Sequence, residues 1–159
     1  MAYDREAAVH YALRWALDRN PAYYDFENLG GDCTNFTSQC LFAGSGRMNP
    51  RPDTGWYYRS LSDRAPAWTG VKFLQDFLLT NAGAGPYAAV TELAQVEPGD
   101  VIQLAVNGGF YHSLVVVQSE PPISPQSIWI CAHTYDALRR PLSSYIYGEY
   151  RCLHILGAR

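Results

Sequence analysis

The chain has 159 residues, of which 48% are hydrophobic and 17% are charged. This composition is typical of one globular domain with a buried core and excludes a disordered chain. The formal net charge is −3 and the twelve Lys and Arg residues are scattered, so we expect no nucleic-acid partner. We predict a single domain over 1–159, with a helical part over about 1–95 and a β part over about 96–159.

The sequence leaves the cellular compartment open. Its apolar runs, such as 114–117, are far shorter than the ~20 residues that cross a bilayer, so we expect no membrane span. The first residues lack the basic and apolar blocks of a signal peptide. Residence in the cytoplasm and export after removal of a leader both stay open, as does the oligomeric state.

Three helices are predicted in the first half. Residues 4–17 carry apolar side chains at helical spacing behind Asp4, which can cap the helix. A second helix is predicted from Cys33 to about residue 43, with Asp32 as its N-cap and Gly44 as its end.

A long loop precedes the third predicted helix. Residues 44–67 are rich in Gly, Pro, Asn and Arg, which is typical of loops. The helix is expected to begin at Trp68 or Thr69 and to end at Thr80. Its buried face is predicted to hold Val71, Phe73, Leu74, Phe77 and Leu78.

The second half predicts strands over 101–106, 111–118, 127–133 and 151–156. The segment 107–109, Asn-Gly-Gly, predicts a hairpin turn between the first two. Helices followed by strands indicate an α+β fold, in which N-terminal helices pack on a C-terminal antiparallel β-sheet.

The cysteines separate into one candidate nucleophile and three core residues. The chain has no Cys-x-x-Cys pair and no Cys/His cluster with zinc spacing, and we expect no disulfide framework. Cys40, Cys131 and Cys152 each stand among apolar neighbours, which predicts small buried side chains.

Cys33 is the predicted nucleophile. It follows Gly30-Gly31-Asp32 and opens the second helix, where backbone N–H groups and the helix dipole favour a thiolate. The same N–H groups can donate to an oxyanion beside the sulfur, and the glycines leave room for a substrate backbone.

His112 is the predicted general base, because it begins a strand just after a hairpin and should be rigid and partly exposed. His133 ends the next strand and is predicted to orient the His112 ring, with Asp136 as an alternative orienting residue. His10 is expected in solvent, and His154 at a core or surface position of the last strand.

Four further residues are candidates for contact with the substrate or its oxyanion: Asp32, Asn35, Tyr24 and Trp56. The alternative for Asp32 is a capping role alone. The many aromatic side chains suit either a groove for a peptide or glycan or a Tyr-rich core.

Several motifs together resemble a known family: Gly30-Gly31-Asp32-Cys33-Thr34-Asn35-Phe36, Gly99-Asp100-Val101-Ile102, Tyr111-His112-Ser113 and Ala132-His133-Thr134. Over nearly its whole length the chain is similar to the putative amidase domain family. That family looks like a papain-like branch close to the NlpC-type and CHAP-type cell-wall hydrolases. The resemblance implies a papain-like fold and amide hydrolysis by Cys33 and His112, with His133 as the third residue.

The sequence thus predicts a thiol hydrolase of the amidase or peptidase kind, whose chemistry needs no metal or cofactor. The resemblance implies a peptide or peptidoglycan-like substrate. Two alternatives stay open: an acyltransferase that uses the same Cys-His pair, and a peptide- or glycan-binding module without turnover. For the binding module we would expect a groove filled by Trp56 and Tyr58.

Overall fold

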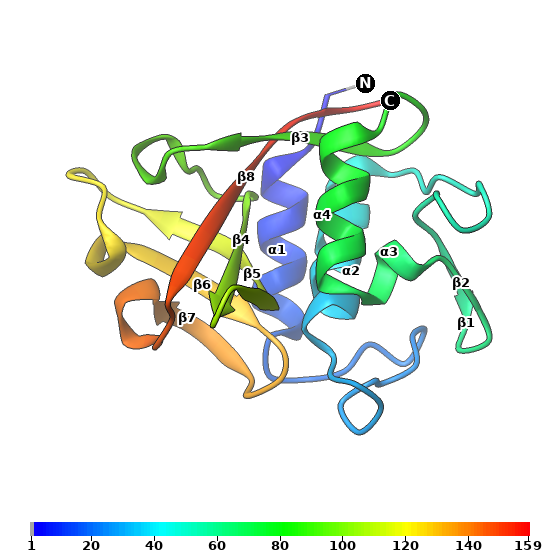
Figure 1. Cartoon of the computed structure of the whole chain (residues 1–159), viewed down its shortest axis with the longest axis horizontal. Coiled ribbons are helices and arrows are strands. Elements are labelled where there is room, and N and C mark those ends of the chain that lie inside the picture. Colours follow the sequence, from blue (N-terminus) through cyan, green and yellow to red (C-terminus); the bar gives the residue numbers. More distant parts are fainter. Residues whose placement is uncertain (1) are drawn as a thin grey trace.

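The computed structural model describes residues 2–159. Helices and a sheet form two layers, with the sheet on one side and the helices on the other (Figure 1). The helices are α1 (Arg5–Trp15), α2 (Cys33–Ser45), α3 (Pro66–Thr69) and α4 (Val71–Thr80). The predicted α+β fold, with helices first and an antiparallel sheet after them, is confirmed.

The main sheet has six antiparallel strands in the order β3-β8-β4-β5-β6-β7 within the described residues. The strands are β3 (Pro86–Thr91), β4 (Val101–Val106), β5 (Gly109–Ser119), β6 (Ile128–Ala132), β7 (Ala137–Pro141) and β8 (Glu149–Ala158). Short 3-10 turns occur at Leu93–Gln95, Pro125–Ser127 and Leu142–Ser144. Strand β5 is central, and its alternating side chains face two different cores.

The two faces of β5 are distinguished by their partners. Val115 and Val117 pack with Phe36 and Cys40 of α2, so odd-numbered positions face the helices. Leu114 and Val116 pack in a second core formed by strands and by the loops beyond them. This alternation decides which way each site residue on β5 points.

The first two helices form close to their predicted bounds. The carboxylate of Asp4 accepts a hydrogen bond from the Ala7 N–H and caps α1 as predicted. The predicted end of α2 at Gly44 is wrong, because the helix continues to Gly46, which has a φ of 71°. Gly44 instead allows a close approach, since a Cβ there would lie 2.8 Å from the Asp4 carbonyl oxygen.

The third predicted helix is divided in two. Pro66 occupies the first turn of α3, and Gly70 separates α3 from α4. Leu74, Phe77 and Leu78 are buried as predicted. Phe73 is 56% exposed, so its predicted inward position is wrong.

Four strands lie where no regular structure was predicted. The loop over 44–67 contains a small antiparallel pair, β1 (Tyr58–Ser60) and β2 (Asp63–Arg64). Strands β3 and β7 form the two edges of the main sheet. Because β3 belongs to this sheet, the β part begins before residue 96, and the predicted boundary near 95 is wrong.

None of the helices within residues 2–159 is long and apolar enough to cross a bilayer. The four cysteines are free and buried, as the structure describes them. Cys40 and Cys131 have no exposed surface and Cys152 is 1% exposed, which confirms the predicted core positions.

Candidate active site

A glycine turn leads the chain into α2. Gly30 and Gly31 have φ angles of 88° and 100°, which favour glycine over other residues. A Cβ on Gly31 would lie only 3.2 Å from the Thr134 hydroxyl oxygen. That hydroxyl accepts the Asp32 N–H at 2.8 Å and joins the turn to the loop after β6. Cys33 follows as the first residue of α2.

Asp32 is 1% exposed and lies in the protein interior. It occupies the N-cap position, but its side chain accepts no helix N–H and does not act as the predicted cap. Its Oδ1 accepts from the Phe26 N–H and from Asn35 Nδ2, while Oδ2 lies 2.5 Å from His133 Nδ1. The prediction that Asp32 contacts substrate is therefore not supported, since both oxygens are already engaged.

Asn35 and Trp56 are also structural. Asn35 is 1% exposed and accepts the Trp68 indole N–H through Oδ1. Trp56 has no exposed surface and donates its indole N–H to Ser38 Oγ. Both side chains are buried and bonded within the protein, so the structure does not support their predicted contact with substrate, and Trp56 cannot fill the groove expected of a binding module.

Tyr24 remains accessible. It is 42% exposed, and its ring packs edge-on against Phe26. Its carbonyl oxygen accepts a hydrogen bond from Asn35 Nδ2, which ties the segment before the glycine turn to α2. Contact of Tyr24 with a substrate stays a prediction.

The sulfur of Cys33 lies against β5 at Ser113. Neighbouring Thr34 makes a 3.0 Å hydroxyl contact with Ser113, which fixes the start of α2 on the strand. Burial raises the pKa of Cys33, although the backbone N–H of Ser113 and the Thr34 hydroxyl and N–H act in the opposite direction. Cys33 is 8% exposed, and its resting state is therefore the thiol.

His112 precedes Ser113 on β5 and points to the opposite face. Its ring centroid lies 5.9 Å from that of Tyr145 and 5.8 Å from that of Tyr111. Burial, aided by the positive charge of Arg140, lowers the pKa of His112 to about 4. The imidazole is therefore neutral at pH 7, and no hydrogen bond within residues 2–159 engages either of its nitrogens.

Cys33 and His112 are thus brought to adjoining positions, but they are not joined. The sulfur lies beside the backbone of residue 113, and the imidazole belongs to residue 112. No sulfur-to-nitrogen hydrogen bond connects the two side chains in the part of the chain described. A catalytic hydrogen bond is often long or unformed before substrate binds.

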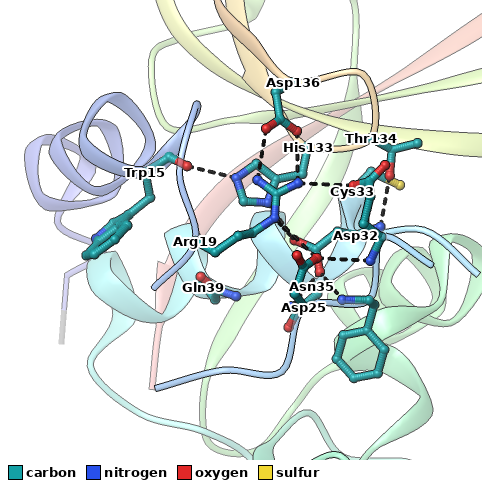
Figure 2. Close-up of polar contacts among 12 residues, drawn as sticks. Trp15, Arg19, Asp25, Asp32, Cys33, Asn35, Gln39, His133, Thr134 and Asp136 are labelled. Atoms are coloured by element: carbon teal, nitrogen blue, oxygen red, sulfur yellow. Dashed lines mark hydrogen bonds and ion pairs between the residues drawn. The ribbon is translucent and has the colours of Figure 1, made fainter. Parts of the chain in front are cut away.

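His133 was predicted to orient the His112 ring, but its ring is engaged by other residues. Its Nδ1 lies 2.5 Å from Asp32 Oδ2 and its Nε2 lies 2.8 Å from the Trp15 carbonyl oxygen (Figure 2). Its ring stacks on Phe36, with centroids 4.0 Å apart. Both nitrogens are occupied, so His133 links three elements and supports the residue next to Cys33.

Asp136 is likewise held away from His112. Arg19 donates to both of its oxygens, at 2.9 and 3.0 Å. The same guanidinium lies 3.2 Å from Asp25 and 3.7 Å from Asp32 (Figure 2). The alternative orienting residue is therefore part of a charged network that ties the loop after β6 to the end of α1.

The remaining histidines lie outside this site. His10 is exposed on α1, as predicted. His154 lies on β8, where Nδ1 is 2.9 Å from Asp100 Oδ2.

A pocket of about 470 Å³ borders His112. It is lined by Tyr111, His112, Thr134, Tyr135, Arg140, Ser144, Tyr145 and Ile146. Sequence reasoning missed Arg140 and Tyr145, because they lie beyond the predicted strand in a segment read as a polar loop. In the sequence, a basic residue before a proline and two nearby tyrosines form no pattern that predicts a position close to His112.

No group of three or more His, Cys, Asp and Glu side chains in residues 2–159 is arranged to hold a metal ion. Comparison with known proteins identifies the family of the chain. A family model described as "Putative amidase domain" matches residues 2–156. The chain belongs to this family.

One curated relative gives a second comparison. The chain is 37% identical over 143 residues to the "Uncharacterized protein YhbB" of Bacillus subtilis (strain 168). The match covers 87% of this chain and 43% of the relative, so the chain spans less than half the relative's length. No solved structure matches the chain. The description of the family names a putative amidase domain.

Proposed function

We propose that the protein is a cysteine-dependent amide hydrolase in which Cys33 is the nucleophile and His112 the general base. The observation that carries the proposal is the position of the Cys33 sulfur against the backbone of Ser113, the residue that follows His112 on β5. Family membership supports amide hydrolysis, and the geometry supports the assignment of the two groups.

The reaction starts from a neutral pair rather than an ion pair. Burial raises the pKa of the Cys33 thiol and lowers that of His112, so the proton rests on sulfur. When substrate is bound, an imidazole nitrogen takes this proton as the sulfur attacks the carbonyl carbon. Cleavage of the C–N bond leaves a thioester, and the imidazolium returns its proton to the departing amine.

Hydrolysis of the thioester completes the cycle. His112 removes a proton from water, the resulting hydroxide adds to the carbonyl carbon, and the C–S bond breaks. The thiolate recovers its proton from the imidazolium, and a free acid is released. No change of oxidation state is involved.

The start of α2 offers donors for the oxyanion. The first helix N–H groups lack a partner within the helix, and the side chain of Asp32 does not cap them. The first backbone bond of this turn is donated by the Phe36 N–H to the Asp32 carbonyl. The N–H of Cys33 is thus free to donate to an oxyanion formed at the sulfur.

Alkylation tests the pair without knowledge of the substrate. Iodoacetamide should label Cys33, whereas Cys40, Cys131 and Cys152 should react only after unfolding. Replacement of the base by His112→Asn should slow Cys33 labelling about 10²-fold, at the lower end of general-base effects. The exposed His10→Asn is the matched control and should label at the wild-type rate. Equal labelling rates in wild type and His112→Asn would refute the assignment of the base.

Turnover tests the nucleophile. We propose peptidoglycan stem peptides as the first substrates to try, with mass spectrometry of digested cell-wall fragments as the measurement. Cys33→Ser should fold normally and lose at least about 10³-fold in kcat/KM, because a catalytic nucleophile and its base act as a unit. Undiminished turnover in Cys33→Ser would show that another group attacks the amide.

A further inference from the structure

The pocket beside His112 contains an arginine without an acidic partner. Arg140 lies on β7, and its Nε donates to Ser144 Oγ at 2.7 Å while Nη2 donates to the Ser144 carbonyl at 3.0 Å. A guanidinium has five N–H donors, so three remain available. Arg140 forms no ion pair within residues 2–159, whereas Arg5 and Arg19 each contact carboxylates.

The guanidinium is held in a fixed position. It lies 3.7 Å from the centroid of the Tyr145 ring, a cation–π contact that adds to its two bonds with Ser144. Tyr145 is partly buried and packs against the core behind the pocket. A donor fork that is already ordered loses little entropy when it binds a planar anion.

The rest of the pocket is mainly aromatic and aliphatic. Tyr111, Tyr135 and Ile146 are exposed at its wall. Asp136, which precedes β7, is bound by Arg19 and does not neutralise Arg140. The pocket therefore combines an apolar surface with one available positive charge, next to the base of the proposed reaction.

We propose that Arg140 binds a carboxylate of the substrate, so that the enzyme acts on amides whose acyl or amine part carries a free acid on an apolar or aromatic group. This inference rests on the proposed function and adds a substrate class to it. Among charged groups that peptides carry, the planar carboxylate is the one that a guanidinium fork binds through two parallel hydrogen bonds.

A matched pair of small probes tests the anion site directly. The probes are 3-phenylpropionate and its uncharged amide, 3-phenylpropionamide, and binding is followed by NMR of the His112 ring. The acid should bind at least about tenfold more tightly than the amide, as expected for a charge-assisted bidentate contact. A bound anion next to His112 should also raise its pKa, a readout that a purely structural arginine would not give.

Neighbouring arginines supply the control. Arg140→Met keeps an unbranched apolar stem without the guanidinium and should reduce the acid-to-amide affinity ratio to about one. Arg140→Lys keeps the charge without the fork and should retain part of the preference. Arg139→Met should keep the wild-type ratio, because the Arg139 side chain contacts Gln118 and does not line the pocket. Thermal unfolding of each variant shows whether it is folded.

The outcomes separate this inference from the proposed function. A wild-type ratio near one, or an equal loss in Arg139→Met and Arg140→Met, would overturn the carboxylate site even if Cys33 labelling still depends on His112. A clear preference for the acid in a protein whose Cys33 labelling is independent of His112 would support the site and refute the catalytic pair.

Discussion

His112 owes its proposed role to an unusual environment for a histidine. It is 5% exposed and adjoins the positively charged Arg140. Since burial and this charge both oppose protonation, its pKa falls to about 4 from an ordinary 6.5. A neutral imidazole can accept a proton, but the low pKa of His112 and the raised pKa of Cys33 both oppose the transfer, so bound substrate has to favour the charged pair.

Titration of His112 tests this directly. We expect NMR of its ring to give a midpoint near pH 4, and activity to persist below pH 6, where an unperturbed histidine would be protonated. Arg140→Met should move the midpoint upward, because it removes the second cause of the shift. A midpoint near 6.5 in the wild type would contradict a buried neutral base.

The same shift links stability to pH. The unfolded chain binds a proton at His112 near pH 6.5 and the folded chain only near pH 4, so unfolding takes up protons between these values. The folded state should therefore lose roughly 3 kcal/mol as pH falls from 6.5 to 4. Urea unfolding of wild type and His112→Asn at both pH values measures this loss of stability. The variant should lack the part of the loss that comes from His112.

Among the elements, α2, β5 and β6 could be predicted to within two residues at each end, and α2 ends later than predicted. The Asn107-Gly108 turn has positive φ at both positions, as the hairpin signal requires. Cys33 begins its helix and His112 lies on its strand as expected. The alternation of side chains along a strand also predicts that Ser113 and His112 lie on opposite faces of the sheet.

The partners of these residues could not be predicted in the same way. Asp32 and His133 are 101 positions apart, and no spacing rule joins a helix start to a strand end at that separation. The two edge strands were not predicted, because their residues have low strand propensity. Strand β3 begins with proline and carries two alanines, and β7 contains two arginines. Edge strands with few β-branched and aromatic residues are hard to tell from loops by composition.

His133 connects three elements, and its replacement should lower the stability of the fold. His133→Ala leaves the buried Asp32 carboxylate without its closest partner and opens a cavity beside Phe36. We expect unfolding to become easier by about 3 kcal/mol, which corresponds to a melting temperature about 9 °C lower for a chain of this size.

The control for His133→Ala is the exposed His10→Ala on α1, which should melt within about 1–2 °C of the wild type. Calorimetry of the two variants makes the comparison. An unchanged melting temperature in His133→Ala, together with a large fall in kcat, would instead point to a part in the chemistry itself.

At the scale of the whole molecule, the first helix and the last strand are joined through Asp100. This carboxylate has no exposed surface. It accepts hydrogen bonds from Arg5 Nη1, the Glu97 N–H and the Ile155 N–H, and it lies 2.9 Å from His154 Nδ1. One side chain thus holds together segments from both ends of the described chain.

Asp100→Asn should weaken the entire fold, because an amide cannot accept from all these donors. We expect a loss of about 4 kcal/mol in the free energy of unfolding. Asp76→Asn, which removes an exposed pair with Lys72, should cost less than about 0.5 kcal/mol. Urea unfolding followed by tryptophan fluorescence and by far-UV circular dichroism should give coincident curves if 1–159 is one domain.

The unequal burial of the cysteines has a practical consequence. Of the four thiols, Cys33 has the most exposed surface, at 8%, while the others lie within the cores. A spin label carried by a methanethiosulfonate reagent should therefore attach at one place in the unaltered chain. Paramagnetic broadening would then reveal which protons of a bound ligand approach the sulfur, and so map the path of a substrate across the molecule.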